Sequence, residues 1–107
     1  MKRGLIKVSV MYPSKPNYTF DMDYYVNKHV PMVVGLIGDF IKGAAIEKGL
    51  SGGSPDTKPA YVAQGHMYFD SIESFQNSFG PNADKILGDI PNYTDIEPAI
   101  LISEVMV

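Results

Sequence analysis

The sequence contains no cysteine, and its 9 Lys and Arg residues are outnumbered by 12 Asp and Glu. Without cysteine the chain forms no disulfide, thiolate metal site or cysteine nucleophile; this suits a reducing compartment, so we expect a cytoplasmic protein. The formal net charge of −3 argues against electrostatic binding of nucleic acid. No apolar run approaches the roughly 18 residues of a membrane span, so we expect no membrane association.

The N-terminal segment also lacks the pattern of a signal peptide, because Lys7 interrupts its apolar run, Pro13 ends it and no small-residue cleavage site follows. What is present fits a single globular domain over residues 1–107, with 45% hydrophobic and 20% charged residues. A domain of this length buries only roughly two thirds of its unfolded surface. We therefore expect a thin core that a partner subunit would help to stabilise.

The hydrophobic pattern predicts four strands and two helical regions in the order β–α–β–β–α–β. The strands are expected over residues 5–12, 40–49, 60–69 and 98–107. The first helix begins near Thr19 or Asp21, whose side chains can accept hydrogen bonds from free amides of the first turn. Pro31 lacks an N–H, so we expect it either to end the first half of this helix or to kink it, with residues 32–38 continuing the helix.

The second helical region is predicted over residues 72–79, with Asp70 or Ser71 as its cap. Glu73 lies three residues after Asp70, as in a capping box. Asn82 is expected to cap a short further helix over residues 83–88. The loop over residues 50–59 is rich in Gly, Ser and Pro, which predicts an exposed segment.

This order of elements is that of the split βαβ, or ferredoxin-like, arrangement, an α+β fold whose antiparallel sheet carries both helices on one face. The second face is too apolar to remain in water. It would expose Leu5, Met11, Val62, Tyr68, and Leu101 or Ile100. Because an identical sheet is the simplest cover, the sequence predicts a homodimer.

Strand alternation directs Gln64, His66 and Tyr68 to this second face, together with Ser9 of the first strand. A half-apolar space with a few convergent polar groups is typical of a small-molecule site, so we interpret these three residues as substrate-binding candidates. The alternative is that the polar groups bond one another across a filled dimer core.

Tyr25 and His29 are spaced i, i+4 and share a helix face beside Pro31. An imidazole can act as acid or base near neutral pH, and a tyrosine hydroxyl beside it can orient a substrate oxygen. The alternative is that His29 is a partly buried helix residue bonded to a backbone carbonyl. Metal binding has little support, because the two histidines are 37 positions apart and only Asp89 offers a third ligand.

Four segments together resemble the EthD family, named for ethyl tert-butyl ether degradation, within the dimeric α+β barrel superfamily. They are KVSVMYP, FDMDYYVNKHVPMV, YFDSIESFQNSFGPNADKILGDIPNYTDIEP and ILISEV. The resemblance implies two ferredoxin-like subunits packed sheet on sheet. It further implies proton transfer by His29 with Tyr24 or Tyr25 as its helper, and no cofactor.

Two function classes remain open. The first is a cofactor-independent lyase, isomerase or cyclase acting on a small hydrophobic oxygenated compound in a catabolic pathway, within an inter-sheet cavity. The second is a non-catalytic binding or accessory protein of such a pathway. We expect the site where the first helix meets the ends of the first and third strands. Its expected lining is Tyr12, Tyr24, Tyr25, His29, His66 and Tyr68, although alternation directs Tyr12 to the helix side.

Overall fold

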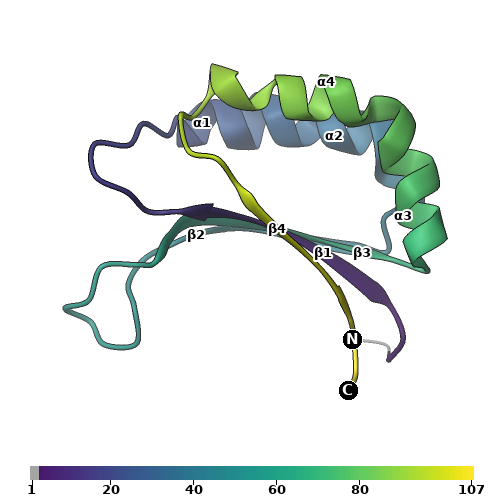
Figure 1. Ribbon diagram of the computed structural model, residues 1–107, viewed down its shortest axis with the longest axis horizontal. Helices are drawn as coiled ribbons and strands as arrows, with labels where there is room; N and C mark the ends of the chain where they lie inside the picture. Colours follow the sequence, from purple (N-terminus) through teal and green to yellow (C-terminus); the bar gives the residue numbers. More distant parts are fainter. Residues whose placement is uncertain (1–2) are drawn as a thin grey trace.

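The computed structural model describes residues 3–107 and contains one four-stranded sheet with helices on one face (Figure 1). The strands are β1 (Ile6–Pro13), β2 (Gly43–Lys48), β3 (Tyr61–Phe69) and β4 (Ala99–Glu104). Their spatial order is β2-β3-β1-β4, and every neighbouring pair is antiparallel. The predicted ferredoxin-like α+β fold is therefore confirmed.

The two faces of the sheet follow from the alternation of β1. Val8 is opposite Met67 of β3 and Ile102 of β4, and these three side chains lie on the helix-covered face. Ser9 is opposite His66 and Leu101, which lie on the other face, hereafter the outer face. A shift of one residue would exchange the two sets, so the apolar face fixes the register.

The first helical region is continuous from α1 (Met22–Tyr24) through a π-helical turn, η1 (Tyr25–His29), into α2 (Val30–Ile37), and ends in η2 (Gly38–Phe40). The carboxylate of Asp21 caps it by accepting the Tyr24 N–H at 3.0 Å. The helix continues past Pro31 to Ile37, as expected for residues 32–38, so the alternative in which Pro31 ends its first half is not the one observed. Pro31 lies in the first turn of α2, where its missing N–H costs little, and the π-helical turn precedes it.

The second helical region contains α3 (Ile72–Phe79), η3 (Gly80–Asn82), α4 (Ala83–Gly88) and η4 (Ile90–Asn92). The cap of α3 is Ser71, whose hydroxyl accepts the Ser74 N–H at 3.0 Å, so the capping-box pairing of Asp70 is wrong. Asn82 occupies the N-cap position of α4, as predicted, but its side chain makes no capping hydrogen bond there. Its side-chain amide donates to the Ser78 carbonyl at 2.9 Å and so satisfies the end of α3 rather than the start of α4.

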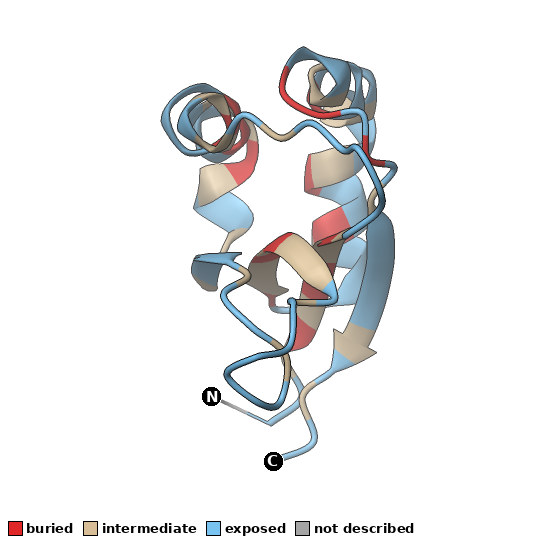
Figure 2. Cartoon of the chain, turned by 90° about the vertical axis from the view of Figure 1, so that its left-hand side faces the viewer, coloured by how far each residue is buried: buried red, intermediate tan, exposed pale blue. Residues whose placement is uncertain are grey.

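The core lies between the helices and the sheet and consists of two clusters. In Figure 2 buried segments occur in both helical regions and in the sheet beneath them. One cluster is aliphatic and phenylalanine-rich, and the other is rich in tyrosine. Their buried members are Val8, Val33, Ile37, Phe69, Phe75 and Ile86 in the first, and Tyr12, Tyr25, Ala63, Tyr93 and Ile96 in the second.

The outer face carries no helix from residues 3–107, and all the helices lie on the opposite side of the sheet (Figure 1). Leu101 is 53% exposed there, whereas Ile100 pairs with Val10 and so belongs to the helix-covered face. Met11, Val62 and Tyr68 are half-buried. The apolar outer face predicted from the sequence is thus present, with Leu101 as its β4 member.

Candidate functional site

A cavity of about 130 Å³ lies between the helices and the sheet. Its walls are aliphatic and aromatic side chains from all four strands of the sheet and from α2, α3 and α4. Val34 of α2, Leu87 of α4 and Ile100 of β4 line it and are about half exposed, so they mark its mouth. Among the residues that line it, only His29, Tyr12 and Tyr25 have polar side chains. The cavity is therefore an apolar chamber with a few polar groups, as in most small-molecule sites.

His29 is held by a carboxylate at the wall of this cavity. Its Nδ1 lies 2.9 Å from Oδ2 of Asp89, and the histidine side chain is only 7% exposed. A carboxylate oxygen accepts, so Nδ1–H donates, and in the neutral imidazole Nε2 keeps a free lone pair. The alternative expectation, a bond from His29 to a backbone carbonyl, is therefore wrong.

Asp89 receives two further hydrogen bonds, both on Oδ1. The Tyr24 hydroxyl donates at 2.7 Å and the Asn92 side-chain amide at 2.9 Å. Partial burial favours the neutral carboxyl, but hydrogen bonds from Asn92, Tyr24 and His29 outweigh it and leave the pKa of Asp89 below its ordinary value. The carboxylate is thus ionised at neutral pH and suited to stabilise a positive charge on His29.

The ring of His29 also belongs to an aromatic cluster. Tyr25 stacks on it with ring centroids 5.9 Å apart, and Tyr93 lies on another side at 4.8 Å. The hydroxyls of Tyr93 and Tyr12 are 2.6 Å apart and buried. Burial raises the pKa of Tyr12, of Tyr25 and of Tyr93, so all three phenols are neutral hydrogen-bonding groups at physiological pH.

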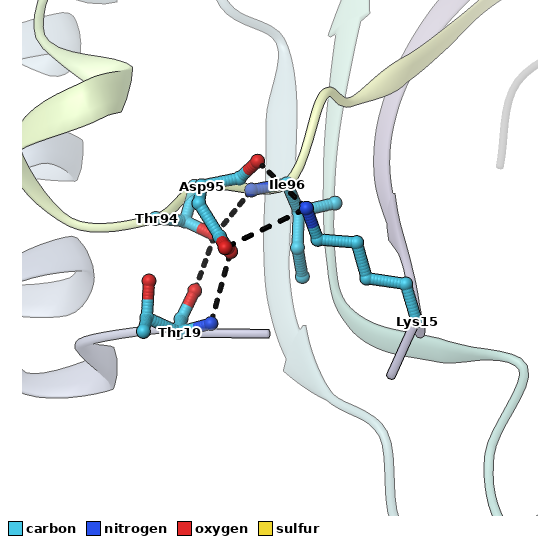
Figure 3. A network of polar contacts seen from close by, with 5 residues as sticks. All are labelled: Lys15, Thr19, Thr94, Asp95 and Ile96. Carbon is cyan, nitrogen blue, oxygen red and sulfur yellow. Dashed lines mark hydrogen bonds and ion pairs between the residues drawn. The ribbon is translucent and has the colours of Figure 1, made fainter. Parts of the chain in front are cut away.

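A polar network at the chain segments preceding α1 and β4 anchors Tyr93 (Figure 3). The Thr19 N–H donates to the carboxylate of Asp95 at 2.9 Å, and Lys15 pairs with the same carboxylate at 3.5 Å. In return the Thr94 hydroxyl donates to the Thr19 carbonyl at 2.7 Å. The two segments are thereby joined at the residues that follow Tyr93, and the carbonyl of Tyr93 itself accepts the N–H of Asp21, the cap of α1.

The structure divides the predicted site residues between the two faces of the sheet. Tyr12, Tyr25 and His29 line the cavity, and Tyr24 supports it through Asp89. The other three candidates, Gln64, His66 and Tyr68, lie on the outer face. One chain therefore does not bring all seven residues to a single site.

The outer-face residues form a network of their own. His66 Nε2 lies 2.9 Å from Gln64 Oε1 and 3.0 Å from Glu47 Oε1, so this nitrogen is the donor. The other nitrogen, Nδ1, then accepts from the Ser9 hydroxyl at 2.9 Å. Tyr68 lies apart from this network, beneath Lys7, whose Nζ is 5.9 Å from the ring centroid.

Asp89 and Tyr93 are the site residues that sequence reasoning did not select. They lie 60 and 64 positions after His29, and no local spacing relates them to it. Asp89 was considered only as a third metal ligand beside the two histidines, and both residues lie in the run from Asp89 to Asp95, which is rich in turn-forming side chains. In the part of the chain that the structure describes, no group of three His, Cys, Asp or Glu is placed to hold a metal ion. Nor does a helix there have the length and apolarity needed to cross a membrane.

Comparison with known proteins places this geometry in a family. The model of the EthD domain matches residues 18–97. An EthD-like protein from Ralstonia eutropha has a crystal structure that aligns with 43% sequence identity and a TM-score of 0.90, covering 99% of this chain and 96% of that one. The comparison with curated proteins gave no match.

Two more distant structures share the fold. A dimeric protein of ferredoxin-like fold from Bacteroides fragilis aligns at 10% identity and a TM-score of 0.62, covering 97% of this chain and 99% of that one. The hydroxynitrile lyase of Passiflora edulis aligns at 14% identity with the same TM-score, covering 97% and 95%. At such identities the likeness extends to the fold alone.

Proposed function

The chain belongs to the EthD family, and from that premise we propose that it is a cofactor-independent acid/base catalyst acting on a small, mostly apolar, oxygenated molecule. The reaction class is that of lyases, isomerases and cyclases, and the setting is a catabolic pathway. The observation that carries the proposal is the hydrogen bond between His29 and Asp89 at the wall of an apolar cavity. A buried imidazole with one nitrogen fixed and the other free is suited to proton transfer.

Each polar group has a distinct part in this proposal. His29 Nε2 accepts a proton from the substrate, and the Asp89 carboxylate stabilises the imidazolium that results. Tyr24 is a positioning residue, because its hydroxyl holds Asp89 rather than the cavity. Tyr25 faces the substrate oxygen, while the Tyr12 hydroxyl is occupied by Tyr93 and shapes the cavity wall.

The distant likeness to a hydroxynitrile lyase suggests a first probe reaction. Mandelonitrile is uncharged and largely apolar, and its cleavage needs only proton transfer. In that step His29 Nε2 takes the hydroxyl proton, the carbon–carbon bond to the nitrile breaks as the carbonyl forms, and cyanide leaves with the electron pair. Cyanide then takes the proton from His29, and the products are benzaldehyde and hydrogen cyanide.

The experiment measures release of benzaldehyde from mandelonitrile, and proton exchange at the α-carbon of cyclohexanone, in wild-type protein and in His29→Ala. An acid/base role of His29 accounts for about 10²–10⁴-fold of turnover. Loss of that magnitude in a folded variant that still binds ligand supports the proposal. Unchanged turnover in His29→Ala would refute it. His66→Ala changes a residue on the outer face, outside this cavity, and should leave turnover close to that of the wild type.

The second candidate is a non-catalytic binding or accessory protein of a degradation pathway. The nearly apolar lining of the cavity favours it, since such walls bind apolar compounds without requiring chemistry. Binding without turnover across a range of small cyclic alcohols, ketones and cyanohydrins would select this alternative.

We also propose that two copies pack through their outer faces. Leu101, Met11 and Val62 supply apolar surface there, and a relative of the same fold from Bacteroides fragilis is dimeric. In such a dimer Gln64 and His66 lie in the space between the sheets. There they would bind a ligand or form a polar core with Ser9 and Glu47.

A further inference from the structure

The hydroxyl of Tyr25 is buried in an apolar cavity and has no hydrogen-bond partner among residues 3–107. The residue is only 3% exposed. In contrast, the hydroxyls of Tyr12 and Tyr24 are bonded to Tyr93 and Asp89. Within the described residues, no side-chain oxygen or nitrogen that is sealed from solvent lacks a partner. The Tyr25 hydroxyl is therefore open to the cavity, where its partner has to come from outside the chain.

The position of this hydroxyl depends on Gly65 of β3. A Cβ added at Gly65 would lie 2.9 Å from the Tyr25 oxygen, closer than side chains normally approach, and 3.4 Å from Ile46. The Tyr25 ring has little freedom to move away, because Tyr12 and Phe20 contact it edge-on at centroid distances of 5.6 and 5.3 Å. The absence of a side chain at residue 65 thus leaves the space in which the hydroxyl lies.

The remaining lining limits what can meet that hydroxyl. No Lys, Arg, Asp or Glu lines the cavity, and His29 is already paired with Asp89. An anionic ligand would lose its hydration without gaining a free counter-charge. In size, the cavity of about 130 Å³ is close to the ~150 Å³ apolar cavity that holds benzene in another protein.

We propose that the Tyr25 hydroxyl, in the space left by Gly65, recognises the single oxygen of an uncharged ligand about the size of a six-membered ring. Such ligands are small cyclic alcohols, phenols and ketones. This inference rests on the proposed function in sharing its cavity, but it concerns recognition and holds whether or not turnover follows. Tyr25 is a donor to this oxygen and Gly65 a specificity-determining position.

The test compares phenol with benzene and benzoate, which differ at the group that Tyr25 is assigned to recognise. Each is titrated at neutral pH while the methyl signals of Ile46 and Met67, which line the cavity, are followed by NMR. In Tyr25→Phe, phenol should bind about 3- to 10-fold more weakly, the value of one hydrogen bond, and benzene should change less than about 2-fold. Benzoate should bind far more weakly than phenol to the wild type.

Gly65→Ala provides a second, independent variant. Its methyl group should displace the Tyr25 hydroxyl, weaken phenol selectively and lower the unfolding temperature. In the double variant Tyr25→Phe/Gly65→Ala the methyl group has the space of the missing hydroxyl, so the loss of stability should largely disappear. Tyr18→Phe, a substitution at an exposed tyrosine outside the cavity, is the control.

Equal losses of phenol and benzene affinity in Tyr25→Phe, or none, would overturn the inference, as would benzoate binding as tightly as phenol. If Tyr25→Phe does not fold, the phenol-to-benzene ratio in Gly65→Ala decides. Selective phenol binding without any turnover would support the inference while rejecting the catalytic proposal. If turnover is observed but phenol binds no more selectively than benzene, the catalytic proposal is supported and the inference about Tyr25 is rejected.

Discussion

The hydroxyls of Tyr12 and Tyr93 lie 2.6 Å apart in the core, although the residues are 81 positions apart in the sequence. This bond joins β1 to the segment between η4 and β4. Tyr12 is 1% exposed and Tyr93 is 3% exposed, so neither hydroxyl has water as an alternative partner. The hydrogen bond therefore fixes the position of Tyr12, which lines the cavity, and of Tyr93, whose ring packs against that of His29.

Tyr12→Phe and Tyr93→Phe should each lower the free energy of unfolding by about 1–3 kcal/mol, because each leaves a buried hydroxyl unpaired. The double variant should cost clearly less than the sum of the two, since neither hydroxyl then remains. Chemical denaturation of the four proteins measures this coupling. Strict additivity would show that the two hydroxyls do not interact.

Asp89→Asn should show a pH-dependent loss of stability. The pKa of Asp89 is lowered in the folded protein, so its contribution is fully present above the ordinary carboxyl pKa of about 3.9 and is lost as the pH falls through the folded value. The difference in unfolding free energy between wild type and Asp89→Asn should therefore be largest above about pH 5 and shrink in acid. Denaturation curves between pH 2 and 7 provide the measurement.

Asp56→Asn is the matched control for this pH series, because Asp56 is exposed in the β2–β3 loop and no described contact involves its carboxylate. Its curve should parallel the wild type at every pH. A difference for Asp89→Asn that stays constant into acid would contradict the role assigned to its three hydrogen bonds.

Ser71→Ala should destabilise the protein by about 1 kcal/mol, because the Ser71 hydroxyl caps α3. Asp70→Ala removes only an exposed ion pair with Lys42 at 3.6 Å, so it should cost less. Thermal unfolding of the two variants side by side distinguishes the cap from its neighbour. A larger loss of stability in Asp70→Ala than in Ser71→Ala would instead identify Asp70 as the cap, as in the capping box predicted from the sequence.

The outer face should hold two copies together. Leu101→Glu places a charge in this apolar surface and should convert a dimer into a folded monomer. Leu50→Glu, in the loop between β2 and β3, introduces the same charge at a residue that is 83% exposed and should leave the dimer intact. Sedimentation at low micromolar concentration measures both, and a wild-type monomer under these conditions would contradict the proposed dimer.

Local features of the sequence predicted the fold well, because they depend on neighbours along the chain. The alternation of β1 reflects one apolar face, and the helix caps Asp21 and Ser71 could be placed from the type of their side chains. The π-helical turn that precedes Pro31 was not predicted, because no composition rule signals it. Asn82 was placed correctly at the start of α4, but the sequence did not show that its side-chain amide donates to a carbonyl of the preceding helix instead of capping α4.

Only part of the candidate site could be predicted from the sequence, because its other contacts join residues that are distant along the chain. Tyr25 and His29 are one helical turn apart, so spacing alone brought them together. Asp89 reaches His29 because the two helical regions pack on the same face of the sheet, a relationship that depends on the whole fold. Alternation directed His66 to the outer face correctly, but it could not show that the cavity lies on the other side.

The tautomer of His29 decides whether this residue can accept a proton from a ligand, because that role requires Nδ1–H to face Asp89 and Nε2 to be free in the cavity. At about pH 8.5, where an ordinary imidazole is neutral, nitrogen–proton correlation NMR separates protonated from unprotonated ring nitrogens. We expect His29 to carry its proton on Nδ1, and its Nε2 signal to shift when phenol is added. His66 should show the opposite tautomer, with the proton on Nε2, and no comparable shift. A proton on Nε2 of His29, or a His29 signal that phenol leaves unchanged, would contradict the account.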